Sequence, residues 1–153
     1  MKCQFCYTSY MLAFNHILAG SIIAVVIPAP LVPVVALASH YVLDTFPHSF
    51  GEEPPFSRLL KIQIAIDAVV SVITVLFLMW LFPPNQWSIV GIGIFFSVVP
   101  DALWLFWRKG GPKWFDKFLD WAHWIQWGER PYGWIFDAFY GFIFTFTLFV
   151  LVR

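Results

Sequence analysis

Charged side chains are scarce in this sequence: only 12% of its 153 residues are charged, whereas 60% are hydrophobic. A soluble globular domain carries roughly 25% charged residues, and a chain this short has too small an interior to bury such an excess of apolar side chains. The formal net charge is zero, so no basic surface indicates a nucleic acid as partner. The composition instead predicts a single integral-membrane domain over residues 1–153, with membrane lipid around it.

Cysteine is nearly absent, and the two that occur, Cys3 and Cys6, form one Cys-x-x-Cys motif. Such a motif can be half of a zinc site, a redox pair or a chance arrangement. The sequence has no second pair to complete a four-sulfur zinc site, so the role of this pair stays open.

The fold prediction is based on the long apolar runs of the sequence. A helix that crosses a bilayer needs about 20 apolar residues, and prolines or glycines separate the successive candidates. A further segment, 113–127, mixes charged and apolar residues at helical spacing, which predicts an interfacial amphipathic helix on the membrane surface. We therefore expect an all-α fold, a polytopic membrane helix bundle with five transmembrane helices at about residues 11–27, 31–46, 59–82, 87–107 and 132–152.

Lysine and arginine are divided very unevenly between the two predicted sides of the membrane. The C-terminal side carries only Arg153. Cytoplasmic loops are normally the ones enriched in basic residues, which predicts a cytoplasmic N-terminus and an external C-terminus in a prokaryotic plasma (inner) membrane. The basic residues on the N-terminal side are Lys2, Arg58, Lys61, Arg108, Lys109, Lys113, Lys117 and Arg130.

Ionisable residues nevertheless fall inside the predicted spans, and all of them lie in the cytoplasmic halves. An ionisable group at the centre of a span costs roughly 2.5–3.5 kcal/mol on insertion scales and normally faces a functional interior. Their shared depth predicts one polar cavity that is open to the cytoplasm. These residues are His16, His40, Asp44, Asp67, Asp101 and Asp137.

The pair His40 and Asp44 is the strongest candidate for metal binding. A separation of four residues places both side chains on one helix face, and imidazole nitrogen and carboxylate oxygen are ligands for zinc, manganese or iron. The same pair could instead be a hydrogen-bonded helix pair. His48 lies two turns further on and could cap the site, although Pro47 leaves its direction open.

The sequence gives less support for metal binding by the remaining acids and histidines. Asp67 and Asp137 could accept the second N–H of a ligand histidine, or they could face water near the membrane surface. His123 lies on the charged stripe of the predicted surface helix, where solvation is the ordinary state. Whether Asp137 and His123 join the site is left open by the sequence.

Three short stretches carry a resemblance to a known family: Asn15-His16-Ile17-Leu18-Ala19-Gly20, Ser39-His40-Tyr41-Val42-Leu43-Asp44 and Val99-Pro100-Asp101. They are similar to the His-x-x-x-Gly, Ser-His-x-x-x-Asp and Leu-Pro-Asp motifs of the predicted membrane-bound metal-dependent hydrolases, which are distantly similar to zinc-dependent phospholipase C. The family's x-Asp-His continuation and its Arg-Gly-x-Thr-His-Ser motif are absent here, so the chain resembles a divergent member. The resemblance implies a metal site formed by His16, His40, Asp44 and Asp101.

The leading prediction is therefore an integral-membrane metal-dependent hydrolase that acts on an ester or phosphoester of a lipid-like substrate at the cytoplasmic leaflet. The alternatives are a metal-ion or proton carrier, whose polar groups should continue to the outer face, and a non-catalytic membrane subunit. The predicted cofactor is a divalent metal, zinc or alternatively manganese, and the predicted catalytic residues are Asp101 and Asp67. The predicted metal ligands are His16, His40, Asp44, His48 and Asp101.

Overall fold

The computed structural model describes residues 12–48, 58–106, 113–125 and 132–153, and no strand forms among them. The prediction of an all-α fold is confirmed. Short 3-10 turns precede the second and fourth α-helices, at Ala29–Leu31 and Pro84–Gln86. The α-helices of this part of the chain are α1 (Ala13–Val26), α2 (Val32–Leu43), α3 (Arg58–Leu81), α4 (Trp87–Phe106), α5 (Lys113–Ile125) and α6 (Gly133–Val152).

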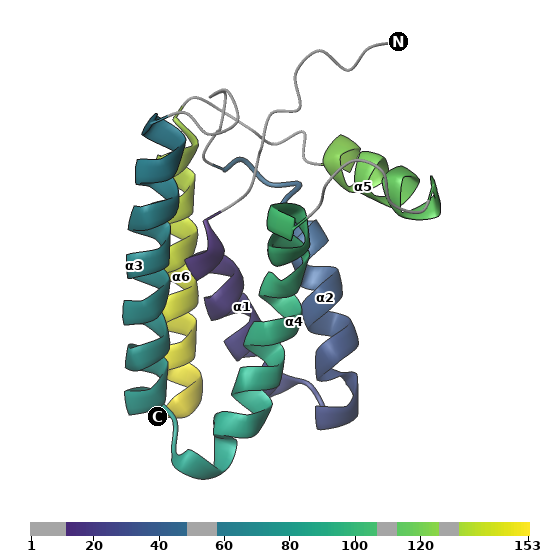
Figure 1. The fold of residues 1–153 in the computed structure, drawn as a ribbon. Helices are drawn as coiled ribbons and strands as arrows, with labels where there is room; N and C mark the ends of the chain where they lie inside the picture. Colours follow the sequence, from purple (N-terminus) through teal and green to yellow (C-terminus); the bar gives the residue numbers. More distant parts are fainter. Residues whose placement is uncertain (1–11, 49–57, 107–112, 126–131) are drawn as a thin grey trace.

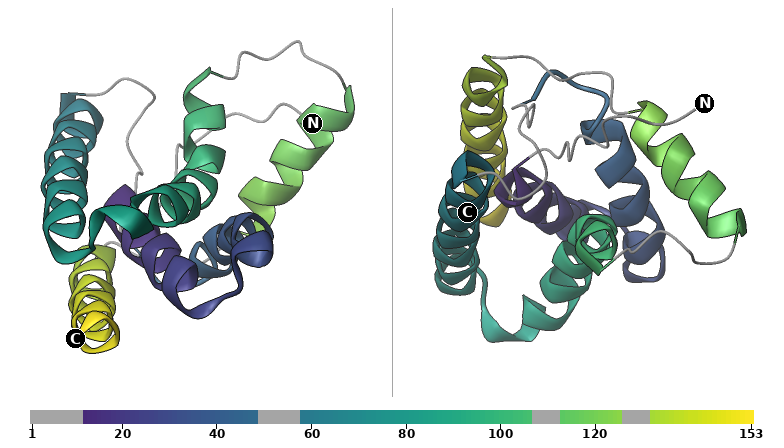
Figure 2. Two further views of the ribbon diagram at one scale, coloured as in Figure 1. Left: turned by 90° about the horizontal axis from the view of Figure 1, so that it is seen from below. Right: turned by 45° about the horizontal axis from the view of Figure 1, so that its top comes forward.

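Helix α1 lies at the centre of the bundle, where it contacts α2, α3, α4 and α6 (Figures 1 and 2). Prolines at the end of α1 turn the chain so that α2 returns alongside it, and α2 also packs on α4. Helix α5 lies to one side, next to α2, and the Tyr41 ring contacts the rings of Phe118 and Trp121 there. The start of α1 and the ends of α2 and α4 therefore meet at one end of the bundle.

Two glycines bring α1 and α4 into backbone contact. A Cβ atom on Gly20 would lie 2.5 Å from the carbonyl oxygen of Gly93 and 2.5 Å from Ser97 Oγ, which is closer than real Cβ atoms approach. Small residues at a helix crossing allow such backbone approach. Because Gly20 is one turn after His16 and Gly93 is one turn before Ser97, this crossing fixes the spacing of the two helices directly beside the polar residues.

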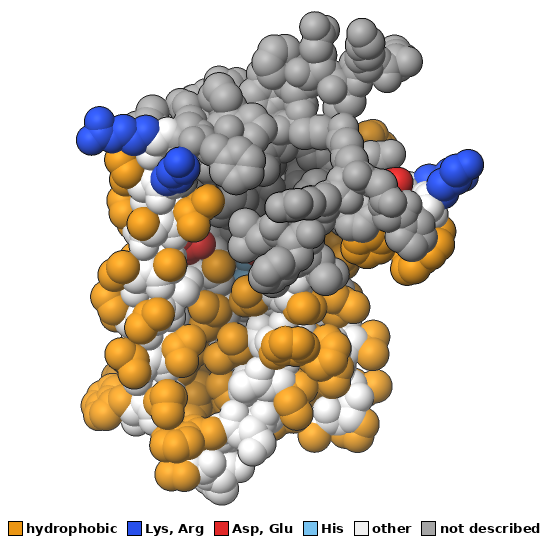
Figure 3. Space-filling view, in the orientation of Figure 1, with side chains coloured by type: hydrophobic (Ala, Val, Ile, Leu, Met, Phe, Trp, Pro, Cys, Tyr) orange, Lys and Arg blue, Asp and Glu red, His pale blue; other side chains and the backbone are white. Residues whose placement is uncertain are grey.

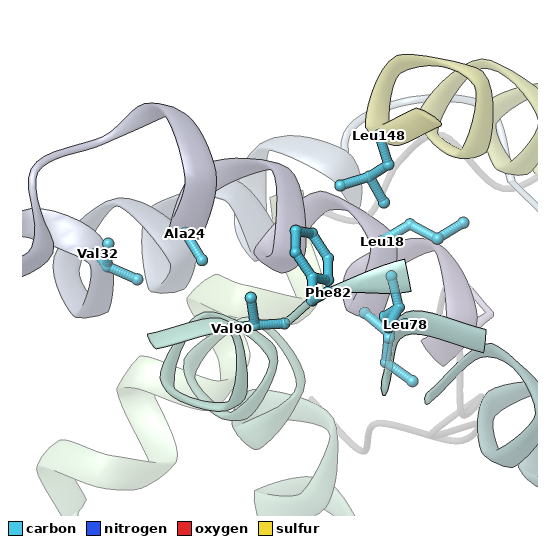
Figure 4. Packing of buried hydrophobic residues seen from close by; sticks show 8 residues of the cluster. Leu18, Ala24, Val32, Leu78, Phe82, Val90 and Leu148 are labelled. Atoms are coloured by element: carbon cyan, nitrogen blue, oxygen red, sulfur yellow. The ribbon is translucent and has the colours of Figure 1, made fainter. Parts of the chain in front are cut away.

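The hydrophobic core extends from Ile17 and Leu18 towards the opposite end of the bundle and joins residues from five helical segments. Figure 4 shows these side chains converging between α1, α3, α4 and α6. Together they anchor the ends of the helices that lie away from the ionisable residues. The labelled members are Leu18, Ala24, Val32, Leu78, Phe82, Val90 and Leu148.

The outer surface of the bundle is strongly apolar. On the face drawn in Figure 3, hydrophobic side chains cover the helices, and lysine and arginine appear only towards the upper end. Large exposed side chains include Leu76 at 61% exposure and Phe142 at 70%. These apolar side chains are not covered by other parts of the described chain. An exposed apolar surface of this kind is compatible with a lipid environment.

Among the residues that the structure describes, two helices, rather than the five predicted, are long and apolar enough by themselves to cross a membrane: Lys61–Leu81 within α3, and α6. Helices α1 and α2 contain 14 and 12 residues, whereas a straight span of a bilayer core about 30 Å thick needs roughly 20. The predicted spans 11–27 and 31–46 include residues that lie outside the helices, such as Leu12 before α1 and residues 44–46 after α2. The segment predicted as a surface helix is helical over Lys113–Ile125, and the last two residues of the predicted range lie outside the described residues.

Candidate metal centre

Three buried residues from two helices meet at the end of the bundle where α1 begins. His16 lies in the first turns of α1, His40 in the last turn of α2, and Asp44 directly follows α2 as its C-cap. The side chains of His16 and Asp44 are fully buried, and that of His40 is 1% exposed. The four-residue spacing of His40 and Asp44 and the return of α2 alongside α1 bring the three together.

The Asp44 carboxylate bridges the Nε2 atoms of the two imidazoles. Its Oδ1 is 3.3 Å from His16 Nε2, and its Oδ2 is 3.3 Å from His40 Nε2. The two imidazole rings stack with centroids 4.3 Å apart. One ligand atom from each residue lies within 4.8 Å of the others, so this group could hold a metal ion. Two nitrogens and a carboxylate oxygen suit zinc and several other divalent metals, so the geometry alone does not select one.

Ser97 of α4 orients both histidines. The Nδ1 atom of His40 donates a hydrogen bond of 2.8 Å to the Ser97 carbonyl oxygen, which directs His40 Nε2 towards Asp44. Such a bond on the far nitrogen sets the tautomer of ligand histidines. The Ser97 hydroxyl donates a bond of 2.8 Å to the carbonyl oxygen of His16. Ser97 is not among the residues predicted from the sequence, although it is a polar residue in an apolar helix and lies four residues before Asp101 on the same face.

His16 provides the observation that points most directly to a bound ion. Within the described residues its Nδ1 has no hydrogen-bond partner and its Nε2 has only the 3.3 Å approach to Asp44 Oδ1, although the side chain is fully buried. Leaving a buried polar group unsatisfied costs about 1–3 kcal/mol. A metal ion bound at Nε2, which faces Asp44, would satisfy that atom.

Asp101, which lies on α4, is next to the group of His16, His40 and Asp44. Its Oδ1 lies 3.7 Å from His40 Nε2, and its side chain is 16% exposed. Its other oxygen, Oδ2, is buried and makes no hydrogen bond within the described part of the chain. Asp101 is therefore next to the group of three and also accessible, which makes it available either to a metal or to a substrate.

Two other predicted site residues, His48 and Asp67, lie outside this group. His48 is buried, and its Nδ1 donates a hydrogen bond of 2.7 Å to the Phe46 carbonyl, but it does not share the cluster of ligand atoms. Asp67 Oδ2 accepts a hydrogen bond of 3.0 Å from the backbone N–H of Ala13.

Asp137 lies on α6 and is fully buried, and it bonds to α1 rather than to the histidine pair. The amide nitrogen of Asn15 donates bonds of 3.2 Å to the carboxylate and to the backbone carbonyl of Asp137. His123 belongs to α5, but its side chain lies outside the described residues, as do Cys3 and Cys6.

The chain matches no family model, no curated protein and no solved structure at a significant level.

Proposed function

We propose that the chain is an integral-membrane metal-dependent hydrolase that cleaves an ester or phosphoester of a lipid-like substrate at the cytoplasmic leaflet. The observation that carries this proposal is the buried group of His16, His40 and Asp44, whose ligand atoms lie within 4.8 Å of one another. Catalytic zinc sites use three such protein ligands and leave a fourth position open. The resemblance of the surrounding motifs to predicted membrane-bound metal-dependent hydrolases supports the same reading, with zinc as the proposed metal.

Asp101 is the residue we propose to act on the reacting water. A divalent ion in this centre would supply a water ligand with a pKa near 7 and would polarise the ester or phosphoryl oxygen. Asp101 lies beside His40, and its 16% exposure leaves it reachable from outside. Its carboxylate can accept the proton of the attacking water while the two histidines and Asp44 hold the ion.

The polar residues favour a hydrolase over a carrier because they are confined to one end of the bundle. His16, His40, Asp44 and Asp101 lie where α1 begins and where α2 and α4 end. Towards the other end, the described residues contain no charged side chain except Arg153 at the C-terminus. A carrier needs polar groups along the whole route, whereas a one-sided cavity admits substrate from a single leaflet.

We propose that α1 and α2 form a short helical hairpin beside the longer helices, completing a bundle of five membrane segments. The length and apolar surface of α3 and α6 support this arrangement. The strong excess of basic residues on the N-terminal side supports a cytoplasmic N-terminus and an external C-terminus in a prokaryotic plasma membrane.

Helix α5 is the proposed interfacial element. Its Trp114 and Trp124 side chains are 70% and 75% exposed, and Lys113 and Lys117 are also exposed. Tryptophan and lysine together are typical of helices that lie at the headgroup level of a bilayer. This position would place the metal centre near the ester and phosphate groups of the lipids.

The test combines metal analysis with hydrolysis, using full-length protein purified in detergent. We expect the wild type to contain zinc and to cleave an ester or a phosphodiester in mixed micelles, with activity removed by a chelator and restored by zinc. His40→Ala should lose both the metal and the activity. Ser39→Ala is the matched control, because the neighbouring Ser39 hydroxyl bonds only to the Ala36 carbonyl of its own helix.

Two results would overturn the hydrolase proposal. If the wild type binds no metal, or if His40→Ala retains it, the three residues form a structural cluster and the chain is better described as a non-catalytic membrane subunit. If the protein binds metal, cleaves no ester and moves metal ions or protons into vesicles, the carrier alternative is correct.

A further inference from the structure

We propose that Asp67 is a positioning residue that holds His16 in place through the backbone of α1, rather than a catalytic acid. It does so as one part of a clamp, which we define as the contacts of Asp67, Asp137 and Ser97 with residues 13–16. This inference rests on the proposed metal centre, because it explains how His16, one ligand of that centre, is held in position.

The clamp joins the first turn of α1 to three different helices. The Ala13 N–H donates to Asp67 of α3 at 3.0 Å, and the Asn15 amide donates to Asp137 of α6 at 3.2 Å. The carbonyl oxygen of His16 accepts a bond of 2.8 Å from Ser97 of α4. Three of the four residues 13–16 are thus fixed from three directions, and the last of them carries the imidazole.

Helix α1 needs this external support because its own sequence provides no cap. Leu12 occupies the N-cap position and makes no side-chain hydrogen bond. The first N–H groups of a helix have no partner within the helix, and an aspartate near them also interacts favourably with the helix dipole. Asp67 supplies from α3 the carboxylate that local sequence does not.

The same geometry argues against a catalytic role for Asp67. Its Oδ2 is already engaged with Ala13, the residue is only 7% exposed, and it is not part of the group of ligand atoms. Asp101, by contrast, lies 3.7 Å from a ring nitrogen of His40 and is more accessible. The two predicted catalytic acids therefore have different roles, one at the reacting water and one at the end of a helix.

The experiment compares Asp67→Ala with Asp67→Asn in the full-length protein. Asparagine is a good N-cap residue because its oxygen can still accept the Ala13 N–H, whereas alanine cannot. We expect Asp67→Ala to weaken zinc affinity by about tenfold, the range seen when a residue that orients a metal ligand is removed. Asp67→Asn should remain close to the wild type in a chelator competition assay.

Hydrogen exchange provides a second readout that does not need metal. Asp67→Ala should accelerate amide exchange in peptides that cover residues 13–16, and Asp67→Asn should restore protection. Thr74→Ala is the matched control on α3, because its hydroxyl bonds only to Val70 of the same helix. If Asp67→Ala does not fold, Ser97→Ala removes another part of the clamp and should shift both readouts in the same direction.

The outcomes separate this inference from the proposed function. Wild-type zinc affinity and exchange in Asp67→Ala would overturn the positioning role, and so would an Asp67→Asn variant as impaired as Asp67→Ala. If the wild type binds no zinc, the proposed function fails, but faster exchange at residues 13–16 in Asp67→Ala would still support the clamp, and unchanged exchange would refute it.

Discussion

Replacement of Asp44 by asparagine is the most direct perturbation of the candidate metal centre. The carboxylate is fully buried, and its two oxygens each lie 3.3 Å from a histidine Nε2. Asparagine has nearly the same volume, so the change removes the negative charge and one ligand oxygen without opening a cavity. Any loss of metal binding would therefore reflect coordination rather than packing.

The expected magnitude follows from the number of ligands. Structural zinc sites bind with about 10–16 kcal/mol, so one of four ligands contributes roughly 2.5–4 kcal/mol. Such a loss corresponds to roughly 10²–10³-fold in affinity. Asp44→Asn should therefore lose zinc to a chelator of moderate strength that the wild type resists.

The assay is competition with a zinc-binding dye, followed by metal analysis of the protein. The control is Thr45→Ala, because Thr45 is the next residue and its hydroxyl bonds only to the nearby Val42 carbonyl at the surface. Equal zinc affinity in Asp44→Asn and the wild type would refute the reasoning, since a carboxylate between two imidazoles would then take no part in coordination.

Three further predictions concern the rest of the chain. Gly20→Ala should lower the free energy of unfolding by about 1–3 kcal/mol, because the new Cβ would meet the Gly93 carbonyl. Gly91 faces open space, so Gly91→Ala should leave thermal unfolding in detergent nearly unchanged. Ser97→Ala should cost about 0.5–1.5 kcal/mol in the same measurement by removing this donor from the buried His16 carbonyl, and equal stability would contradict the role given to the hydroxyl. Reporter fusions at the two ends of the chain should report opposite sides of the membrane, and a result on the same side would rule out an odd number of spans.

The sequence predicts the centre well where the pattern is local. The spacing of His40 and Asp44 shows that they share a helix face, and the depth of His16 and Asp101 in their segments indicates the same end of the bundle. The roles of Asp67 and Ser97 could not be predicted in this way, because each depends on which residue of α1 lies opposite it. Spacing along a helix does not contain that information.

The helix lengths show a second limit of sequence reasoning. The apolar runs correctly indicate where helices occur, as in α3 and α6, but hydropathy does not distinguish a helical residue from an apolar residue in a turn. The predicted span 31–46 therefore extends beyond Leu43, where α2 ends and hydrogen-bonded turns follow. Helix α2 is short because of the backbone geometry after Asp44 and not because of its composition.

The clamp at the start of α1 also has a consequence for the order in which the protein is made. Its three bonds connect residues that are 54, 81 and 122 positions apart in the chain. At a synthesis rate of roughly 5–20 residues per second, Asn15 waits about 6–24 s after its own synthesis before Asp137 exists. During biogenesis α1 is thus the earliest helix of the described bundle to emerge, and its bond to Asp137 can form only after α6 has been made.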